Sequence, residues 1–257
     1  MKAQNDFTEY AAIGTFQTPE ETAAYRQLTA KLKDSPVPNN EIISHLGLYL
    51  DRSALGHILF IHELYRRILD VHGVIIELGV RWGRNLAQFT ELRNLYEPRN
   101  ASRRIIGFDT FAGFPGVSAQ DGAADGIVAG AYSVEPGYET ELAGLLSAHE
   151  RFGLRSHVQK FEVLKGSIID TLPEYLERHP ETIVALAYFD LDLYEGTRQG
   201  LELIRDRLVK GSVVAFDELG LPQMPGEPPA LLDTWGLRDL RIQRSPMSHF
   251  ESFVVIE

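Results

Sequence analysis

Acidic side chains follow two of the apolar segments of the sequence, at the point where each segment ends. Asp190 and Asp192 come directly after one segment, and Asp217 and Glu218 come directly after another. The carboxyl ends of parallel strands meet at one edge of a sheet, so we expect three or four carboxylates to converge there. Converging carboxylates raise one another's pKa, and a divalent cation removes that conflict. The pattern predicts a metal site; the alternative is a set of solvated acids in surface loops.

The ligands define the chemistry of such a site. Oxygen ligands in a chain without cysteine favour Mg²⁺, Mn²⁺ or Ca²⁺ over zinc. A bound metal lowers the pKa of water, and we expect the same effect on a sugar or alcohol hydroxyl, whose proton a nearby carboxylate then removes. The sequence has no G-x-S-x-G motif and no Ser/His/Asp order. Activation of a hydroxyl by a metal and a carboxylate is therefore the expected chemistry.

A glycine turn follows the first apolar segment and leads into a helical pattern. Glu77, Gly79 and Gly83 stand in this turn. The glycines permit a tight turn and a close approach of a ligand to the backbone. The turn lacks the Gly-Lys-Ser/Thr ending of a P-loop, and it is not a G-x-G-x-x-G turn. A ligand-binding turn and a purely structural turn both stay open at this point.

Two further polar positions stand at the ends of the next apolar segments. Asp109 follows the second segment, where a carboxylate is well placed to accept hydrogen bonds from the two hydroxyls of a ribose. Ser167 follows the third segment. Each of these two residues would serve equally well as the cap of a following helix, so both functional and capping roles remain open.

The elements that must position these residues alternate along the chain. Helical patterns cover residues 20–33, 51–70, 84–96, 139–152, 168–178 and 194–209. Nearly continuous apolar runs, typical of strands buried on both faces, cover residues 74–78, 105–108, 161–164, 183–189 and 213–216. We expect an α/β sandwich with a mostly parallel sheet. Residues 239–244 and 251–256 have no helix between them and predict an antiparallel edge pair. We read residues 221–229 as a proline-rich connection or part of an acceptor site.

Composition excludes several classes of function. The 257 residues contain 25 Lys and Arg against 36 Asp and Glu, a net charge of −11. This balance argues against a nucleic-acid or anionic-membrane partner, because phosphate binding requires a basic face. The absence of cysteine excludes disulfides and thiolate catalysis. We expect no signal peptide, no membrane span and a cytoplasmic location. Residues 1–50 are predicted to form a helical extension to a domain of residues 51–257.

Six segments carry a resemblance to a known family. The segments are IIELGVRWGRN, FDTFAGFP, GAYSV, LKGSIIDTLP, YFDLDLYEGT and VVAFDEL, in this order between residues 74 and 220. They resemble the macrocin O-methyltransferase (TylF-like) family. Its enzymes methylate hydroxyls of deoxysugars in antibiotic biosynthesis, with S-adenosylmethionine (AdoMet) and Mg²⁺. The resemblance implies a class I AdoMet-dependent methyltransferase fold and a rhamnose-like acceptor, either nucleotide-linked or on a natural product.

The resemblance also assigns roles to individual positions. Asp190, Asp217 and Glu218 match the metal ligands, although the family more often has aspartate at the last position. Asp190 also matches the general base, with Asp192 as a neighbouring candidate. Residues 130–134 resemble a lid over AdoMet. The positions that match the cofactor pocket are Glu77, Gly79, Val80, Arg81, Asp109, Thr110, Phe111, Tyr132, Ser133, Gly166, Ser167, Ile168 and Asp190.

Alternatives remain for the acceptor and for the outlying residues. A related group methylates catechol-like or phenolic acceptors, but it usually has a lysine where Leu193 and Tyr194 stand here. A protein that only binds AdoMet would have no need of the acidic cluster. His249 is a candidate base or substrate contact, with a surface loop as the alternative. We expect a homo-oligomer, in which residues 1–50 pack on a neighbouring subunit or cover the acceptor site.

Overall fold

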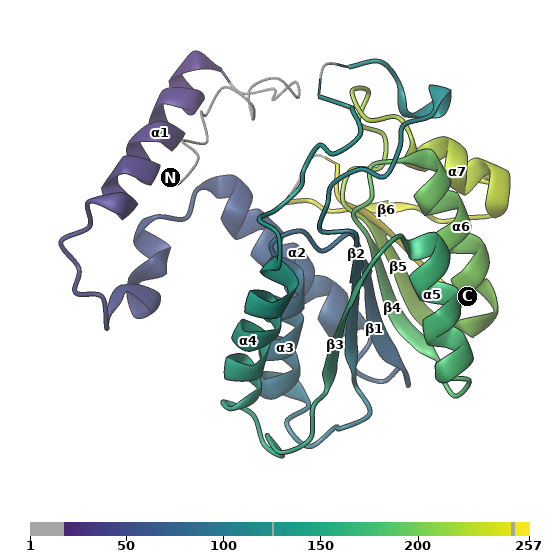
Figure 1. Cartoon of the computed structure of the whole chain (residues 1–257), viewed down its shortest axis with the longest axis horizontal. Helices are drawn as coiled ribbons and strands as arrows, with labels where there is room; N and C mark the ends of the chain where they lie inside the picture. Colours follow the sequence, from purple (N-terminus) through teal and green to yellow (C-terminus); the bar gives the residue numbers. More distant parts are fainter. Residues whose placement is uncertain (1–17, 125, 248–249) are drawn as a thin grey trace.

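A computed structural model describes residues 18–124, 126–247 and 250–257. The described residues form a seven-stranded sheet in the order β3-β2-β1-β4-β5-β7-β6 (Figure 1). The strands from β1 to β5 pair in parallel, and β7 pairs antiparallel with both β5 and β6. This confirms the predicted mostly parallel sheet with an antiparallel edge. The strands are β1 (Val74–Leu78), β2 (Ile105–Asp109), β3 (Phe161–Lys165), β4 (Val184–Phe189), β5 (Leu208–Phe216), β6 (Gln243–Arg244) and β7 (Ser252–Val255).

Helices cover both faces of the sheet, as Figure 1 shows. Across the described residues, none of them combines the length and the apolar character that crossing a membrane requires. Three short 3₁₀ segments add to them: η1 (Ile42–Leu48), η2 (Ala119–Asp121) and η3 (Arg205–Arg207). The α-helices are α1 (Pro19–Lys33), α2 (Arg52–Arg67), α3 (Arg84–Tyr96), α4 (Tyr138–Glu150), α5 (Ile168–Arg178), α6 (Tyr194–Ile204) and α7 (Glu227–Thr234).

Two apolar cores hold the three layers together. Side chains alternate between the faces of a strand, so Ile75 of β1 packs with α2, α3 and α4, while Ile76 packs with α5, α6 and α7. Both side chains are completely buried. Burial on both faces explains why the parallel strands are continuous apolar runs in the sequence. The same arrangement leaves only the ends of the strands free to carry polar groups.

Several element boundaries differ from the prediction; the strand expected over residues 239–244, for example, covers only Gln243–Arg244. The helix expected over residues 194–209 ends at Ile204, because Leu208 already pairs with Val184 of β4 and belongs to β5. The connection expected over residues 221–229 contains the start of α7. Pro228 and Pro229 occupy the first turn of α7, where the N–H that proline lacks would have no partner within the helix.

The buried face of α2 also differs from the one the spacing suggested. Leu55, Ile58 and Leu59 are exposed, although they fit the apolar pattern of the predicted helix. The helix instead turns a neighbouring stripe toward the sheet, which includes Phe60, Leu64 and the polar His57. The segment that precedes this helix is the N-terminal arm, which we define as residues 18–50.

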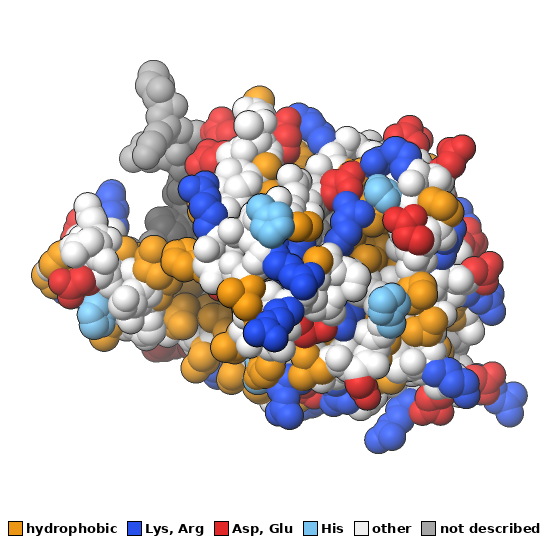
Figure 2. All heavy atoms as spheres, turned by 90° about the horizontal axis from the view of Figure 1, so that it is seen from below, with side chains coloured by type: hydrophobic (Ala, Val, Ile, Leu, Met, Phe, Trp, Pro, Cys, Tyr) orange, Lys and Arg blue, Asp and Glu red, His pale blue; other side chains and the backbone are white. Residues whose placement is uncertain are grey.

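The N-terminal arm stands apart from the sheet (Figure 1). None of the residues in α1 or η1 is buried, and Ile43 and Leu48 expose more than half of their surface. Hydrophobic side chains gather on the arm and on the adjoining part of the body in Figure 2. An isolated helix of 15 residues is marginally stable in water, so the arm lacks the packing that normally holds such a helix.

A buried ion network ties α3 and α4 to the segment before β3. The Arg93 guanidinium donates to Glu150 Oε1 at 2.6 Å and to the carbonyl of Lys160 at 3.1 Å. The Lys160 ammonium lies 2.5 Å from the other Glu150 oxygen. All three side chains are at most 4% exposed. Removing one partner of such a network leaves the remaining charges buried and unpaired.

Replacement of Glu150 by Gln should therefore destabilise the fold strongly. We expect the free energy of unfolding to fall by about 3 kcal/mol, because Arg93 and Lys160 lose their counter-charge in a dry environment. Chemical denaturation measures the change. The matched control is Glu202→Gln, which breaks an exposed pair with Arg198 and should cost less than about 1 kcal/mol. If the two variants lost the same free energy of unfolding, the buried network would contribute no more to stability than the exposed ion pair does.

Candidate active site

A cavity of about 790 Å³ opens at the carboxyl edge of the sheet. It lies where the strand order reverses, between β1 and β4, which is the usual ligand position in open α/β sheets. The segments that follow β1 to β5 all contribute to its wall. Among the predicted site residues, those that line it are Glu77, Gly79, Val80, Arg81, Asp109, Thr110, Tyr132, Ser167, Ile168, Asp190, Asp192 and Asp217.

The glycine at the start of the turn has a structural reason of its own. Gly79 has φ 89°, and a Cβ there would lie 1.8 Å from the carbonyl oxygen of Asp190. The amide of Asp190 in turn donates to the carbonyl of Leu78 at 2.8 Å. The turn after β1 and the acidic segment after β4 are therefore packed backbone to backbone. No other residue type would allow this contact, which places the two segments on one side of the cavity.

Glu77 presents a buried carboxyl group to the cavity. Its side chain is 1% exposed, and burial raises the pKa of the carboxyl well above its usual range. Asn85 at the start of α3 donates one hydrogen bond to it, which partly offsets this effect. Its Oε2 atom has no hydrogen-bond partner among the described residues. A buried acceptor without a donor is costly, and a cationic amino group such as that of AdoMet would satisfy it.

Asp109 is already engaged with the glycine turn. Its Oδ2 atom accepts hydrogen bonds from the amides of Val80 and Arg81, both at 2.7 Å, and its Oδ1 atom accepts from the amide of Phe111 at 2.6 Å. A carboxylate has about four acceptor positions, so one remains on Oδ1. The structure thus gives Asp109 a turn-bracing role beside the cavity and leaves it capacity for one ribose hydroxyl.

Left-handed backbone conformations concentrate around the cavity. Five non-glycine residues in the described range have positive φ, and four of them belong to the site segments. These four are Arg81, Phe111, Tyr132 and Asp192, with φ between 47° and 64°. Such conformations cost free energy and persist only where the surrounding contacts enforce them. The Arg81 guanidinium lies 4.7 Å from the centre of the Tyr132 ring, a cation–π contact across the cavity wall.

Carboxylates converge at the carboxyl ends of β4 and β5, as the sequence predicts. Burial raises the pKa of Asp190 well above its usual range, and the charges of Asp217, Asp192 and Glu77 raise it further. The Arg84 guanidinium acts in the opposite direction. The phenol of Tyr188 donates to Asp217 Oδ1 at 2.5 Å. The excess of negative charge makes Asp190 and Asp217 suitable oxygen donors to a divalent cation.

Glu218 points to a different group of acids. It shares a hydrogen bond with Asp192, and burial together with this bond raises the pKa of the Glu218 carboxyl. Glu227, at the first position of α7, is completely buried and lies close enough to add to this effect. Glu218 does not line the cavity. The three predicted metal ligands therefore lie on one edge of the sheet, but Glu218 faces Asp192 and Glu227.

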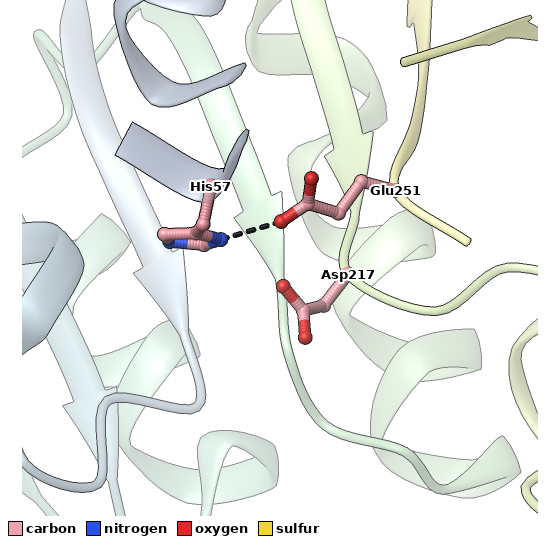
Figure 3. Close-up of side chains that lie close together, drawn as sticks. All are labelled: His57, Asp217 and Glu251. Carbon is pink, nitrogen blue, oxygen red and sulfur yellow. Dashed lines mark hydrogen bonds and ion pairs between the residues drawn. The ribbon is translucent and has the colours of Figure 1, made fainter. Parts of the chain in front are cut away.

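A second group of potential metal ligands lies next to Asp217. Within the described residues, one group of three acidic or imidazole side chains has ligand atoms within 4.8 Å of one another: His57, Asp217 and Glu251 (Figure 3). His57 Nδ1 lies 2.5 Å from Glu251 Oε1. His57 comes from the helix that precedes the sheet, and Glu251 immediately precedes β7. The sequence analysis placed neither of them in the site.

The remaining predicted residues lie around the cavity rather than in its wall. Phe111 is buried in the core, and Ser133 is exposed. Gly166 donates its amide to the carbonyl of Asp109 and so joins β2 to β3. His249 lies outside the described residues. Phe114 exchanges paired backbone hydrogen bonds with residues 130 and 131, so the predicted lid of residues 130–134 begins beside the cavity-lining residues 113–118.

Some cavity residues were not predicted. Asn85, residues 113–118 and Asp121 line the cavity. Asn85 is the second residue of α3, directly after the glycine turn, and this position is the signal that would have indicated it. Asp121 Oδ1 accepts from the amide of Tyr194, which connects the loop after β2 to the start of α6. Nothing in the spacing of these residues indicates that contact.

The fold and the cavity together define a class I AdoMet-dependent methyltransferase. The model of the macrocin O-methyltransferase (TylF) family matches residues 61–227. The chain belongs to this family, and it is an AdoMet-dependent O-methyltransferase. The resemblance inferred from the six sequence segments is thereby confirmed.

Solved structures support the same assignment. A structure of CalS11, a calicheamicin methyltransferase, shares 43% identity over 94% of both chains, with a TM-score of 0.91. A second structure of CalS11, described as a TDP-rhamnose 3′-O-methyltransferase of calicheamicin biosynthesis, shares 40% identity over 97% of this chain and 98% of that chain, with a TM-score of 0.83. The O-methyltransferase NovP shares 17% identity over 78% of this chain and 79% of that chain, with a TM-score of 0.58, and supports the fold alone. A comparison with curated protein sequences found no match.

Proposed function

We propose that the protein methylates a hydroxyl of a rhamnose-like deoxysugar carried on thymidine diphosphate, in the biosynthesis of an antibiotic. The observation that carries this proposal is the identity of 40–43% with CalS11 over nearly the full length of both chains. The cavity supports it, because it is large enough for a sugar beside a cofactor and is lined by several carboxylates. A hydroxyl acceptor requires a proton acceptor, which these groups provide.

The wall of the cavity offers separate positions for the parts of AdoMet. The unpartnered Glu77 oxygen suits the ammonium group, and the free acceptor position of Asp109 suits one ribose hydroxyl. Ser167 and Ile168, at the start of α5, border the position that we assign to the adenine. When bound, AdoMet supplies an electrophilic methyl group on a sulfonium. The chain must then hold the acceptor oxygen in line with that group.

We assign the proton transfer to Asp190. Asp190 lines the cavity beside Gly79, and burial together with the charges of neighbouring acids raises its pKa well above its usual range, which makes the carboxylate a stronger proton acceptor. Asp190 accepts the proton of the sugar hydroxyl while the oxygen takes the methyl group. Asp192 lines the same cavity, but its hydrogen bond with Glu218 makes it the weaker candidate.

We further propose that Asp190 and Asp217 bind Mg²⁺, with Glu218 reaching the ion only after its bond to Asp192 breaks. The unbalanced negative charge around Asp190 supports this. When bound, Mg²⁺ lowers the pKa of a coordinated hydroxyl. Arg81 and Arg84 also line the cavity, close enough to the carboxylates to act on Asp192 and Asp190, and we assign them to the diphosphate of the substrate.

The test is methyl transfer to a panel of acceptors, read by mass spectrometry. We expect methylation of TDP-rhamnose, loss of activity after dialysis against a chelator, and recovery with Mg²⁺. Methylation of a catechol but of no nucleotide sugar or glycosylated natural product would overturn the acceptor assignment. Activity that is unaffected by metal removal would overturn the Mg²⁺ assignment while leaving the acceptor assignment intact.

We also propose that the N-terminal arm is a separate unit that packs on a neighbouring subunit. The arm exposes apolar residues, among them Ile43 and Leu48, and a neighbouring subunit packed against them would remove them from water. Deletion of residues 1–50, which removes the whole arm with Ile43 and Leu48, should reduce the number of subunits in the oligomer, calculated from its mass in light scattering. If that number falls but activity is retained, the arm serves assembly alone. An unchanged number of subunits and unchanged activity would refute both packing on a subunit and covering of the acceptor site.

A further inference from the structure

We propose that His57, Glu251 and Asp217 bind one divalent transition-metal ion of the Zn²⁺, Mn²⁺, Fe²⁺ or Co²⁺ type, behind the cavity wall that Asp217 forms. This site contains a nitrogen ligand and lies beside the all-oxygen Mg²⁺ site proposed above, with which it shares Asp217. It goes beyond the proposed function and does not depend on the identity of the acceptor.

The geometry brings three ligand types together from distant parts of the chain. His57 lies on α2, Asp217 follows β5, and Glu251 precedes β7, and their side chains point toward one another (Figure 3). Their ligand atoms lie within 4.8 Å of one another. Ligands around a tetrahedral ion lie about 3.3 Å apart, because each metal–ligand bond is about 2 Å long. Small side-chain rotations are therefore enough to form the site.

A chain of hydrogen bonds directs the lone pair of His57 into this group. Glu77 accepts a hydrogen bond from Asn85, so the Asn85 amide nitrogen points to Glu77 and its oxygen points the other way. That oxygen lies 2.6 Å from His57 Nε2, which must carry the hydrogen. Nδ1 faces Glu251, and it would present its lone pair to a metal ion bound there. Metal-binding histidines are commonly oriented in this way by a hydrogen bond from the other ring nitrogen.

The buried carboxylate of Glu251 is a second observation that supports a cation site. Its side chain is 8% exposed, and its Oε2 atom has no hydrogen-bond partner within the described part of the chain. The 2.5 Å between His57 Nδ1 and Glu251 Oε1 is a hydrogen-bond distance, so these two atoms must move slightly apart to reach the roughly 3.3 Å that separates two ligands of one ion. The Arg84 guanidinium makes a long hydrogen bond of 3.4 Å to the same Nδ1 atom, which a bound ion would replace.

The donor set indicates the type of ion. An imidazole with two carboxylates suits Zn²⁺, Mn²⁺, Fe²⁺ or Co²⁺ better than Mg²⁺, which prefers oxygen ligands and water. Bound there, the ion would join α2 to the ends of β5 and β7. It would also hold Asp217, which already accepts a hydrogen bond from the buried Tyr188, in one orientation.

The experiment uses the full-length protein loaded with Co²⁺ alone. We expect proton NMR to show one hyperfine-shifted imidazole N–H signal, from His57 Nε2–H, that disappears in D₂O. Glu251→Gln should remove this signal and weaken Co²⁺ binding by more than about 100-fold, since loss of a direct ligand exceeds the 10–100-fold cost of losing a ligand's hydrogen-bond partner. This variant should fold, because the new amide can donate to His57 Nδ1. His57→Gln should have the same effect on binding.

Two controls separate this site from its neighbours. His62→Gln changes another histidine of α2, which bonds to Tyr96 at the surface, and should leave the signal unchanged. Asp190→Asn should also retain the signal, even if it abolishes the proposed Mg²⁺ site and methyl transfer. A Co²⁺-loaded protein without the shifted N–H signal, or a Glu251→Gln variant that keeps both signal and affinity, would overturn the proposal. His57 and Glu251 would then form a buried ion pair only.

Discussion

Replacement of Asp190 by Asn should slow methyl transfer by a factor of about 10² to 10⁴, the contribution expected of a positioned general base. The substitution keeps the shape of the side chain but removes both the proton acceptor and an oxygen donor for Mg²⁺. The fold should survive, because the change also removes a charge that neighbouring Asp217 and Asp192 destabilise. Single-turnover kinetics with saturating AdoMet and acceptor would measure the methyl-transfer step directly.

Asp170→Asn is the matched control for this prediction. Asp170 is an exposed residue in the first turn of α5, outside the cavity wall, and its replacement should leave the rate nearly unchanged. Asp192→Asn distinguishes the two candidate bases. If it slows transfer more than Asp190→Asn does, the roles assigned to these two carboxylates are reversed.

Replacement of Glu77 by Gln should weaken AdoMet binding by about 30-fold or more. This corresponds to about 2 kcal/mol, the lower range for truncating one partner of a buried charge pair. The same change should raise the free energy of unfolding at neutral pH, because the protein without ligand then no longer buries an ionisable carboxyl group. Opposite effects on affinity and stability are what distinguish a ligand-binding group from a structural one.

Stability and AdoMet affinity should change with pH in opposite directions because of Glu77. Burial raises the pKa of Glu77 in the folded protein above its unfolded value, so the folded state binds more protons at pH values above about 4.3. The stabilisation contributed by the protonated carboxyl is complete at low pH and is lost as pH rises toward the folded pKa. AdoMet affinity should increase over the same range, because the ammonium group pairs with the ionised form. Glu77→Gln should abolish the slope of AdoMet affinity and should remove only the part of the stability slope that Glu77 contributes, because the buried carboxyls of Asp190 and Glu218 remain.

Calorimetric titration with AdoMet and denaturation at several pH values would provide these measurements. Glu195→Gln is the control, since Glu195 lines the cavity but pairs with Arg198 and should change AdoMet affinity by less than about threefold. Unchanged AdoMet affinity in Glu77→Gln would show that the unpartnered Glu77 oxygen does not bind the cofactor.

The order of the elements and twelve of the residues that line the cavity could be predicted from the sequence. Continuous apolar runs identify strands buried on both faces, and the alternation with helical patterns implies a parallel sheet. Once a sheet is parallel, residues that follow its strands must meet at one edge. That is why Glu77, Asp109, Ser167, Asp190 and Asp217 could be brought together before any coordinates were known, and why all five line the cavity.

The spacing of apolar residues and prolines was less reliable where it fits two kinds of secondary structure equally well. Leu208 fits the end of a helix as well as the start of a strand, and only its pairing with Val184 decides for the strand. The prolines after Gly226 suggest a loop, yet the first turn of a helix accepts them. The sequence left open whether the turn at Gly79 is structural or binds a ligand, and the structure shows that its missing side chain makes room for the backbone of Asp190 while the residue also lines the cavity.

Sequence alone therefore determined the fold class and the edge of the sheet at which the chemistry must lie, because these follow from periodicity and from which strand each polar residue follows. The family followed from the resemblance of six sequence segments. The tertiary structure decided which acids face one another. Glu218 turns to Asp192, and His57 meets Glu251 across 194 residues of chain. Such pairings depend on side-chain directions and on long-range packing, and neither leaves a trace in local spacing.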